Sequence, residues 1–242
     1  MSDKPVPAKP SASVVVVRDR AQSLEVLLVR RNEKIAFHGG AWVFPGGRVD
    51  DSDSAGIVGT ELDIAKRAAV REAQEEAGLV LTVDAMLPFA HWTTPVELPK
   101  RFATWFFVAV VEGVTDIQID HSEIVDYRWM TPATALGLHA AGELNLPAPT
   151  FITLLDFKAM DSGAALIARL RGVAIQRFVP RLVSIDGNRC TLYHEDAGYQ
   201  TLDIDAPGAR HRLVMKGTDW DYIRDFQESG ELGELGDLPP RF

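Results

Sequence analysis

The sequence of 242 residues is short of cysteine, of long apolar runs and of basic residues. Cys190 is the only cysteine, which excludes an intrachain disulfide and a thiolate metal cluster. No stretch approaches the roughly 18 apolar residues of a membrane span, and residues 1–13 lack the apolar segment of a signal peptide. The formal net charge of −9 disfavours a nucleic-acid-binding surface. These absences make a globular, cytoplasmic protein the default expectation.

The strongest feature that is present is a predicted helix between Asp63 and Gly78. Thr60 is suited to the N-cap, with Asp63 three residues later as in a capping box, and Gly78 is suited to the left-handed residue that ends a helix. The segment between them is rich in alanine, a strong helix former. One face of this helix ends in three carboxylates, at spacings i, i+3 and i+4: Glu72, Glu75 and Glu76.

Three carboxylates on one helix face repel one another unless a cation lies between them. Oxygen ligands of this kind suit hard divalent ions such as Mg²⁺ or Mn²⁺. Arg71 precedes Glu75 by four residues and can orient it through a charge-assisted hydrogen bond. The alternative is a solvated acidic face, which many Glu-rich helices have. The upstream segment Trp42-Val-Phe-Pro-Gly-Gly-Arg48 favours a site, because its glycine pair lets the main chain approach a ligand.

Together these two segments resemble the signature of the Nudix hydrolase family, written G-x5-E-x7-R-E-U-x-E-E-x-G-U with U an aliphatic residue. Residues 71–79 fit its second half, with Ala73 small for U. Asp63 stands where the family has its first Glu, with seven residues between it and Arg71, but fifteen residues rather than five separate it from Gly47. We interpret Val49–Thr60, which is rich in Asp, Ser and Gly, as a surface loop outside the chemistry.

The resemblance covers about Val14–Leu144 and implies an α/β protein with the Nudix fold, a mixed β-sheet sandwiched between helices. Periodicity alone predicts only a mixture of helices and strands. We expect a flexible arm over residues 1–13, a Nudix hydrolase domain over residues 14–148, and an appended segment over residues 149–242 with helices, a β-hairpin and an acidic tail. In the Nudix part, strands are expected at residues 14–17, 24–30, 42–44, 79–83, 87–94, 101–112 and 124–130.

The resemblance also implies a reaction, the cleavage of a diphosphate that is linked to another moiety. Water attacks one phosphorus, while divalent cations on the helix carboxylates neutralise the developing charge. By motif position, Glu72 and Glu76 are metal ligands, and Glu75 is a further ligand or orients the water. A backbone carbonyl at Gly46 or Gly47 adds a ligand, with Gly47 preferred.

Three further positions take their roles from the same comparison. Arg71 and Asp63 correspond to a structural salt bridge of the family signature, and Gly78 to its last glycine. A Glu from a late loop serves as base or ligand in many members; Glu123 is the candidate here and Glu97 the alternative. For either one, an ordinary exposed Glu is an equally good interpretation.

Within the family, the chain looks most like the coenzyme A diphosphatases. The residues that carry this likeness are Leu27-Leu-Val-Arg-Arg31, His38-Gly-Gly40, Phe44-Pro-Gly-Gly47, Trp92-Thr-Thr-Pro95, Lys100-Arg-Phe102 and Trp105-Phe-Phe107. The expected substrate is coenzyme A or a derivative; ADP-ribose, dinucleotides, nucleotide sugars and a non-catalytic ligand sensor stay open.

The expected substrate contacts follow from this likeness. Lys100 and Arg101 are expected to hold a phosphate, with a basic strand end in solvent as an equal alternative. Further contacts are expected from Arg31, Trp92 and Phe44, although aromatic rings mainly fill cores. We expect a small nucleotide diphosphate as the partner, with no nucleic acid and no membrane, and a homodimer is compatible with the sequence.

Overall fold

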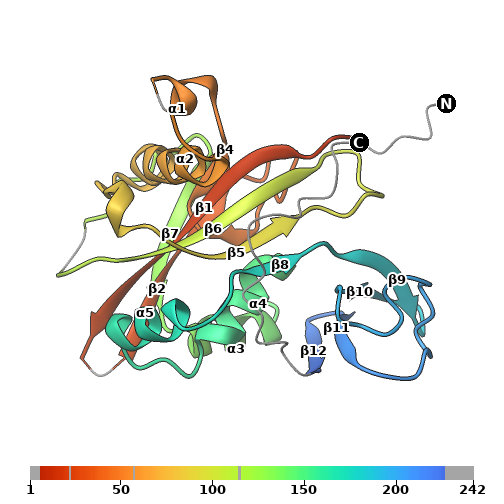
Figure 1. Ribbon diagram of the computed structural model, residues 1–242. Coiled ribbons are helices and arrows are strands. Elements are labelled where there is room, and N and C mark those ends of the chain that lie inside the picture. Colours follow the sequence, from red (N-terminus) through yellow and green to blue (C-terminus); the bar gives the residue numbers. More distant parts are fainter. Residues whose placement is uncertain (1–5, 22, 57, 114–115, 227–242) are drawn as a thin grey trace.

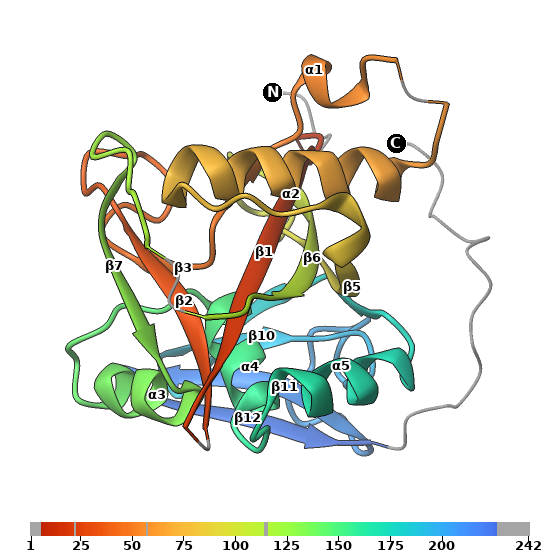
Figure 2. The same ribbon diagram turned by 90° about the vertical axis from the view of Figure 1, so that its left-hand side faces the viewer.

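The computed structural model describes residues 6–226 except residues 22, 57 and 114–115. Its central feature is an eight-stranded mixed sheet, with helix α2 on one face and helices α3, α4 and α5 on the other (Figures 1 and 2). The strand order is β3-β2-β1-β6-β5-β8, while β4 pairs with β1 and β7 with β2. The strands are β1 (Lys9–Arg20), β2 (Ser23–Arg31), β3 (Trp42–Val43), β4 (Gly46–Arg48), β5 (Leu87–Thr93), β6 (Phe102–Val110), β7 (Ile124–Met130) and β8 (Gln176–Phe178).

The apolar run in β1 feeds two hydrophobic cores because alternate side chains of a strand point to opposite faces. Val14 and Val16 pack beneath α2, while Val15 and Val17 pack with the helices of the other face. All four valines are fully buried. This division confirms the expected layered α/β fold, with the sheet between helices.

Helix α2 (Glu61–Ala77) confirms the predicted central helix and its two ends. Thr60 accepts a hydrogen bond from the Asp63 N–H, and Gly78 ends the helix with φ 68°. The face toward the sheet consists of small side chains that let the helix approach closely: Ala65, Ala68, Ala69, Ala73 and Ala77. The other helices are α1 (Asp51–Ser54), α3 (Pro132–Ala140), α4 (Ala148–Phe157) and α5 (Gly163–Arg171), with a 3₁₀ turn η1 (Val83–Ala85). Among the helices of the described residues, none combines the length and apolar character that a membrane span requires.

Two predictions about the strands are wrong. Strand β1 begins at Lys9, inside the arm that we expected to be flexible, because residues 9–17 pair in parallel with β6. Residues 79–83 do not form a strand. The N–H groups of Gly78 and Leu79 donate to carbonyls in the last turn of α2, so this backbone caps the helix. Residues 1–5 of the predicted arm lie outside the described residues.

The C-terminal segment extends the main sheet before it forms a second one. Strand β8 pairs in parallel with β5, and the ring of Phe178 stacks on Trp92 at 3.9 Å. The second sheet has the order β12-β11-β10-β9, built from β9 (Arg181–Ile185), β10 (Asn188–Leu192), β11 (Arg210–Lys216) and β12 (Asp219–Asp225). The β-hairpin expected in the appended segment is confirmed by β9 and β10, and its turn consists of Asp186 and Gly187, both at positive φ. The predicted acidic tail, residues 228–242, lies outside the described residues.

Candidate active site

The glycine turn Pro45–Gly47 lies directly against the acidic face of α2. The Gly46 N–H donates a 2.8 Å hydrogen bond to Glu76 Oε2. A Cβ on Gly47 would lie 2.4 Å from Glu72 Oε1, and one on Gly46 would lie 2.4 Å from the Ala12 carbonyl oxygen. A side chain at Gly46 would therefore clash with the backbone of β1, and a side chain at Gly47 would displace the Glu72 carboxylate.

The carbonyls of this turn do not all face the carboxylates. The Ser11 hydroxyl donates to the Gly47 carbonyl, and the Ser13 hydroxyl donates to the Pro45 carbonyl. In a strand, the N–H and C=O of one residue point to the same side. The Gly46 carbonyl therefore faces the same side as its N–H, toward Glu76. The hydrogen bond from Ser11 argues against Gly47 as the backbone ligand, so we propose the alternative, Gly46.

Burial sets the charge state of the two inner glutamates. Glu76 is 4% exposed, and burial raises its pKa to about 8, with a further contribution from the negative charges of Glu72 and Glu123. The Gly46 N–H and Arg31 oppose this rise without cancelling it. Burial also raises the pKa of Glu72, although Arg71 partly offsets the effect. Without a cation, this cluster of carboxylates therefore holds its negative charge at a cost.

Arg71 joins the acidic face of α2 to the preceding helix. Its Nε and one terminal nitrogen donate to the two carboxylate oxygens of Asp53, at 3.0 and 2.9 Å. Its other terminal nitrogen donates to Glu72 and Glu75, each at 2.9 Å, and a further bond reaches the Arg48 carbonyl. The hydrogen bonds that Arg71 donates to Asp53 raise the pKa of Arg71 further above its usual range. Burial alone would raise the pKa of Asp53, but Arg71 outweighs burial and lowers it.

The predicted pairing of Arg71 with Asp63 is therefore wrong. Asp63 instead caps the N-terminus of α2, where its carboxylate accepts hydrogen bonds from the N–H and the hydroxyl of Thr60, both at 2.8 Å. Asp53 follows Gly47 with five residues between them, which is the first spacing of the family signature. The extra residues lie after Asp53, so the first half of the presumed surface loop Val49–Thr60 belongs to the site (Figure 2).

Arg31 and Glu123 complete the acidic end of the site. The Arg31 guanidinium lies 3.9 Å from Glu76 and 3.7 Å from Glu123. Its Nε is buried and has no hydrogen-bond partner among the described residues. The Asn32 N–H donates to the Glu123 carbonyl at 2.7 Å and fixes this loop. The structure thus brings Glu123 to the site; Glu97 is exposed and acts electrostatically on Tyr199 in the C-terminal segment.

Three of the predicted substrate contacts have other partners in the structure. Phe44 and Trp92 are 3% and 5% exposed and belong to the core, so their rings are not available to stack on a base. Arg101 donates to the carbonyls of Thr94 and Val6 and ties the arm to the loop before β6. These two bonds argue against a phosphate-binding role for Arg101, whereas Lys100 is exposed beside it.

The donor set fits a magnesium-like cation. Within the described part of the chain, no three His, Cys, Asp or Glu side chains are already arranged to hold a metal ion. Mg²⁺, however, is commonly bound through one or two carboxylates and keeps waters or substrate phosphates as its other ligands. Glu72 and Glu76 beside the Gly46 carbonyl provide such a set. Glu75 is bonded to Arg71 and its side chain is 58% exposed, so its role as a ligand or water-orienting group stays a prediction.

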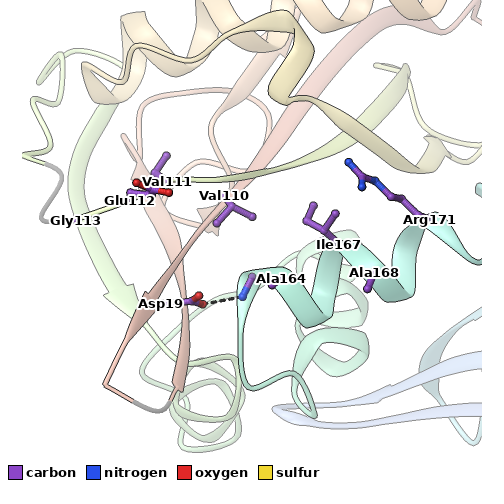
Figure 3. A pocket seen from close by; sticks show the side chains of 10 residues that line it. Asp19, Val110, Val111, Glu112, Gly113, Ala164, Ile167, Ala168 and Arg171 are labelled. Atoms are coloured by element: carbon purple, nitrogen blue, oxygen red, sulfur yellow. Dashed lines mark hydrogen bonds between the residues drawn. The ribbon is translucent and has the colours of Figure 1, made fainter.

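A cavity of about 600 Å³ lies elsewhere, between the end of β6 and helix α5 (Figure 3). Val110, Ile167 and Ala168 give it apolar walls, and Asp19 and Arg171 lie at its rim. Asp19 accepts a 2.7 Å hydrogen bond from the Gly163 N–H and so caps α5. Asp19 lies eight residues along β1 from Ser11, so this cavity is remote from the glycine turn and reflects how the C-terminal segment packs on the sheet.

Comparison with known proteins places this geometry in a family. A model of the NUDIX domain matches residues 7–152, which is more than half of the chain. The chain belongs to the Nudix family. Members of this family are hydrolases of nucleoside diphosphate derivatives, and the glycine turn and α2 together form their signature in this chain.

Individual relatives of this Nudix chain are distant. It is 28% identical over 159 residues to putative nudix hydrolase 7 of Caenorhabditis elegans, covering 51% of this chain and 52% of that protein. It is 22% identical over 230 residues to acyl-coenzyme A diphosphatase NUDT19 of Xenopus laevis, covering 57% and 60%. The matches thus span little more than half of these relatives' length. A NUDIX hydrolase structure from Alicyclobacillus acidocaldarius covers 67% of this chain and 96% of its own, at a TM-score of 0.60 and 22% identity, and so supports the fold.

Proposed function

We propose that this Nudix protein is a divalent-metal-dependent diphosphatase that cleaves a nucleoside diphosphate linked to another moiety. The observation that carries the proposal is the convergence of Glu72 and Glu76 on the backbone of Gly46 and Gly47. Two carboxylates are held there against a close-packed turn, and their pKa values are raised. A bound cation would lower these pKa values by stabilising the charged carboxylates. Such an arrangement is costly for a merely structural helix face.

Each residue of the site has a separate role in this proposal. Glu72, Glu76 and the Gly46 carbonyl would hold the cation, which, when bound, activates water and neutralises the charge on the phosphate oxygens. Arg31 would bind a phosphate oxygen, since its guanidinium lies beside both Glu76 and Glu123. Glu123, which is exposed at the edge of the site, would accept the proton from the attacking water. Arg71 would keep Glu72 and Glu75 in place through its contact with Asp53.

We propose coenzyme A or an acyl derivative as the substrate, with ADP-ribose, dinucleotides and nucleotide sugars as alternatives. The supporting observations are the sequence likeness to coenzyme A diphosphatases and the match to acyl-coenzyme A diphosphatase NUDT19. Coenzyme A carries a phosphate on its ribose, so its recognition needs a cation away from the metal. Lys100, exposed in the loop before β6, is our candidate for that contact.

The proposed reaction is tested by measuring products from coenzyme A, ADP-ribose and a dinucleotide with Mg²⁺, with Mn²⁺ and with a chelator. We expect metal-dependent cleavage at the diphosphate and the highest kcat/KM for coenzyme A. Cleavage that persists in chelator would reject the metal dependence, and a preference for ADP-ribose would reject the substrate while keeping the reaction.

The ribose-phosphate contact is tested with Lys100→Ala and Arg101→Ala. We expect Lys100→Ala to lower kcat/KM for coenzyme A about tenfold and to leave ADP-ribose turnover unchanged, because a lost phosphate contact affects the substrate that carries the phosphate. Arg101→Ala should lower stability and affect both substrates alike. A selective loss in Arg101→Ala alone would reverse the two assignments.

A further inference from the structure

Two buried serines on β1 form hydrogen bonds with the glycine turn Pro45–Gly47 from the side opposite to α2. Ser11 and Ser13 are 7% and 8% exposed, within a strand whose next four residues are valine. A buried hydroxyl is unfavourable unless it forms a hydrogen bond. Both hydroxyls donate to carbonyls of the glycine turn: Ser11 donates to the Gly47 carbonyl and Ser13 donates to the Pro45 carbonyl.

These two carbonyls flank Gly46. The Ser13 bond to the Pro45 carbonyl measures 3.0 Å, and the same carbonyl also accepts the Val14 N–H at 2.9 Å. Residues 11, 12 and 13 pair antiparallel with Arg48, Gly47 and Gly46, so the turn is drawn onto β1 over its whole length. The carbonyls before and after Gly46 are thus both turned toward β1.

Gly46 itself is left facing the other way. Its N–H donates to Glu76, and a Cβ at this position would overlap β1 at Ala12 and Ser13. Glycine has no side chain to fix its peptide orientation, so the orientation must come from its neighbours. The Ser13 bond acts on the peptide group that joins Pro45 to Gly46 and carries the Gly46 N–H, and the Ser11 bond acts one residue further on, on the peptide group that follows Gly47.

We propose that Ser11 and Ser13 are positioning residues that fix the orientation of the Gly46 backbone toward Glu76 and toward the bound cation. The serines do not touch the substrate or the reacting atoms; they act through Gly46. The part of this inference that concerns the cation rests on the proposed function, whereas the part that concerns the Gly46 N–H does not.

The experiment compares wild type with Ser11→Ala, Ser13→Ala and the double variant, with two measurements on each. The first is the amide resonance and hydrogen exchange of Gly46 in metal-free protein labelled with ¹⁵N-glycine. The second is Mn²⁺ affinity by calorimetry. Mutation of a residue that orients a metal ligand typically lowers the metal affinity by about 10–100-fold. We expect the double variant to lose at least tenfold in Mn²⁺ affinity and to exchange the Gly46 amide faster, with Ser13→Ala having the larger single effect on the amide because the Pro45 carbonyl belongs to the same peptide group as the Gly46 N–H.

Controls separate positioning from general damage. Thr191→Val removes a buried hydroxyl in the second sheet, where Thr191 donates to Tyr193, and should change neither measurement. Ser11→Thr and Ser13→Thr keep the hydroxyl, so the Gly46 amide exchange and the Mn²⁺ affinity should both match wild type. If the double variant does not fold, the single variants and their Thr counterparts give the same comparison.

Two outcomes would overturn the inference. A double variant with unchanged Gly46 exchange and unchanged Mn²⁺ affinity shows that the serines do not position Gly46. A Thr replacement that behaves like Ala shows that packing, and not the hydroxyl, matters. If wild type binds no Mn²⁺, the proposed function fails, and the Gly46 amide alone then decides whether the serines position this turn.

Discussion

Asp53 and Arg71 face each other through two hydrogen bonds, of 3.0 and 2.9 Å, although they are eighteen residues apart in the sequence. Asp53 is 5% exposed and also accepts the Asp50 N–H, so its position is fixed by the short helix α1. Arg71 carries this fixed position to Glu72 and Glu75. The short helix α1 is therefore part of the support of the acidic site.

The first prediction tests this support with Asp53→Asn. The variant keeps the shape of the side chain but leaves Arg71 with a neutral partner in a mostly buried place. Arg71 keeps its hydrogen bonds to Glu72 and Glu75 in this variant. We therefore expect a loss of about 2 kcal/mol in the free energy of unfolding, less than the 3–5 kcal/mol of a fully buried pair. Turnover of the diphosphate should fall by at least tenfold, because Glu72 loses its fixed position. Urea unfolding and kcat/KM measure the two effects.

The matched control is Asp63→Asn, at the position that the sequence favoured. Asn is a good residue near a helix N-terminus, so both the free energy of unfolding and the turnover should stay close to wild type. A larger loss of turnover in Asp63→Asn than in Asp53→Asn would restore the original pairing.

The competing choices for the first acidic residue show where sequence reasoning stops. Asp53 has the family spacing to Gly47, and Asp63 has the family spacing to Arg71. Both signals were present, and an insertion makes it impossible to satisfy both at once. Only the fold shows which aspartate pairs with Arg71, because α1 packs against α2 while Asp63 takes part in the N-terminal cap of α2. The central helix and its caps needed no such decision and were predicted correctly.

Aromatic and basic residues were harder to assign for a different reason. A sequence pattern does not distinguish a ring that fills a core from a ring that stacks on a base. Trp92 was misassigned because its partner, Phe178, comes from β8, far along the chain. The hydrogen bonds of Arg101 could not be predicted because their acceptors are main-chain carbonyls, which leave no trace in the sequence. The strand β12 was missed although Trp220 and Tyr222 alternate with aspartates there.

The second prediction concerns Glu76→Gln. Gln keeps the size of the side chain but removes the charge that would bind a cation, so turnover should fall at least about a hundredfold, which is ~2.7 kcal/mol of transition-state stabilisation. Because burial already makes the charged form of Glu76 unfavourable, the metal-free variant should be no less stable than wild type. Turnover at saturating Mg²⁺ and thermal unfolding in chelator measure the two effects. A variant that turns over like wild type would remove Glu76 from the site.

The third prediction concerns the pH dependence of stability and rests on Asp196. Its side chain is fully buried and accepts two 2.7 Å bonds from Arg212, together with the N–H groups of Gly198 and His211. Burial alone would raise the pKa of Asp196, but Arg212 and the N–H donors outweigh it and lower the pKa. Its contribution to stability is therefore present above the unfolded pKa near 4 and is lost as the pH falls below it.

Asp196→Asn should consequently lower the free energy of unfolding at pH 7 by about 3–5 kcal/mol, because it leaves Arg212 buried without its charge partner. The difference from wild type should shrink as the pH falls through 4, which urea unfolding at pH 7, 5 and 3.5 measures. Asp186→Asn, in the exposed hairpin turn, should stay within about 0.5 kcal/mol at each pH. A difference from wild type that grows as the pH falls would contradict the assigned direction of the pKa shift.

The fourth prediction asks whether the C-terminal segment is a separable unit, as the boundary at residue 148 proposes. Phe178 is 3% exposed and stacks on Trp92, so β8 covers the edge of β5 and one side of the core. Phe178→Ala should cost about 3–5 kcal/mol, whereas Val179→Ala, at an exposed neighbour, should cost far less. A chain ending at residue 152 leaves Trp92 and the β5 edge uncovered, and exposed sheet edges pair with other chains. We expect that chain to aggregate or to bind a hydrophobic dye, as followed by light scattering and dye fluorescence. A monomeric, cooperatively folding chain of residues 1–152 would instead show that the Nudix part folds by itself and that β8 is an addition to a complete sheet.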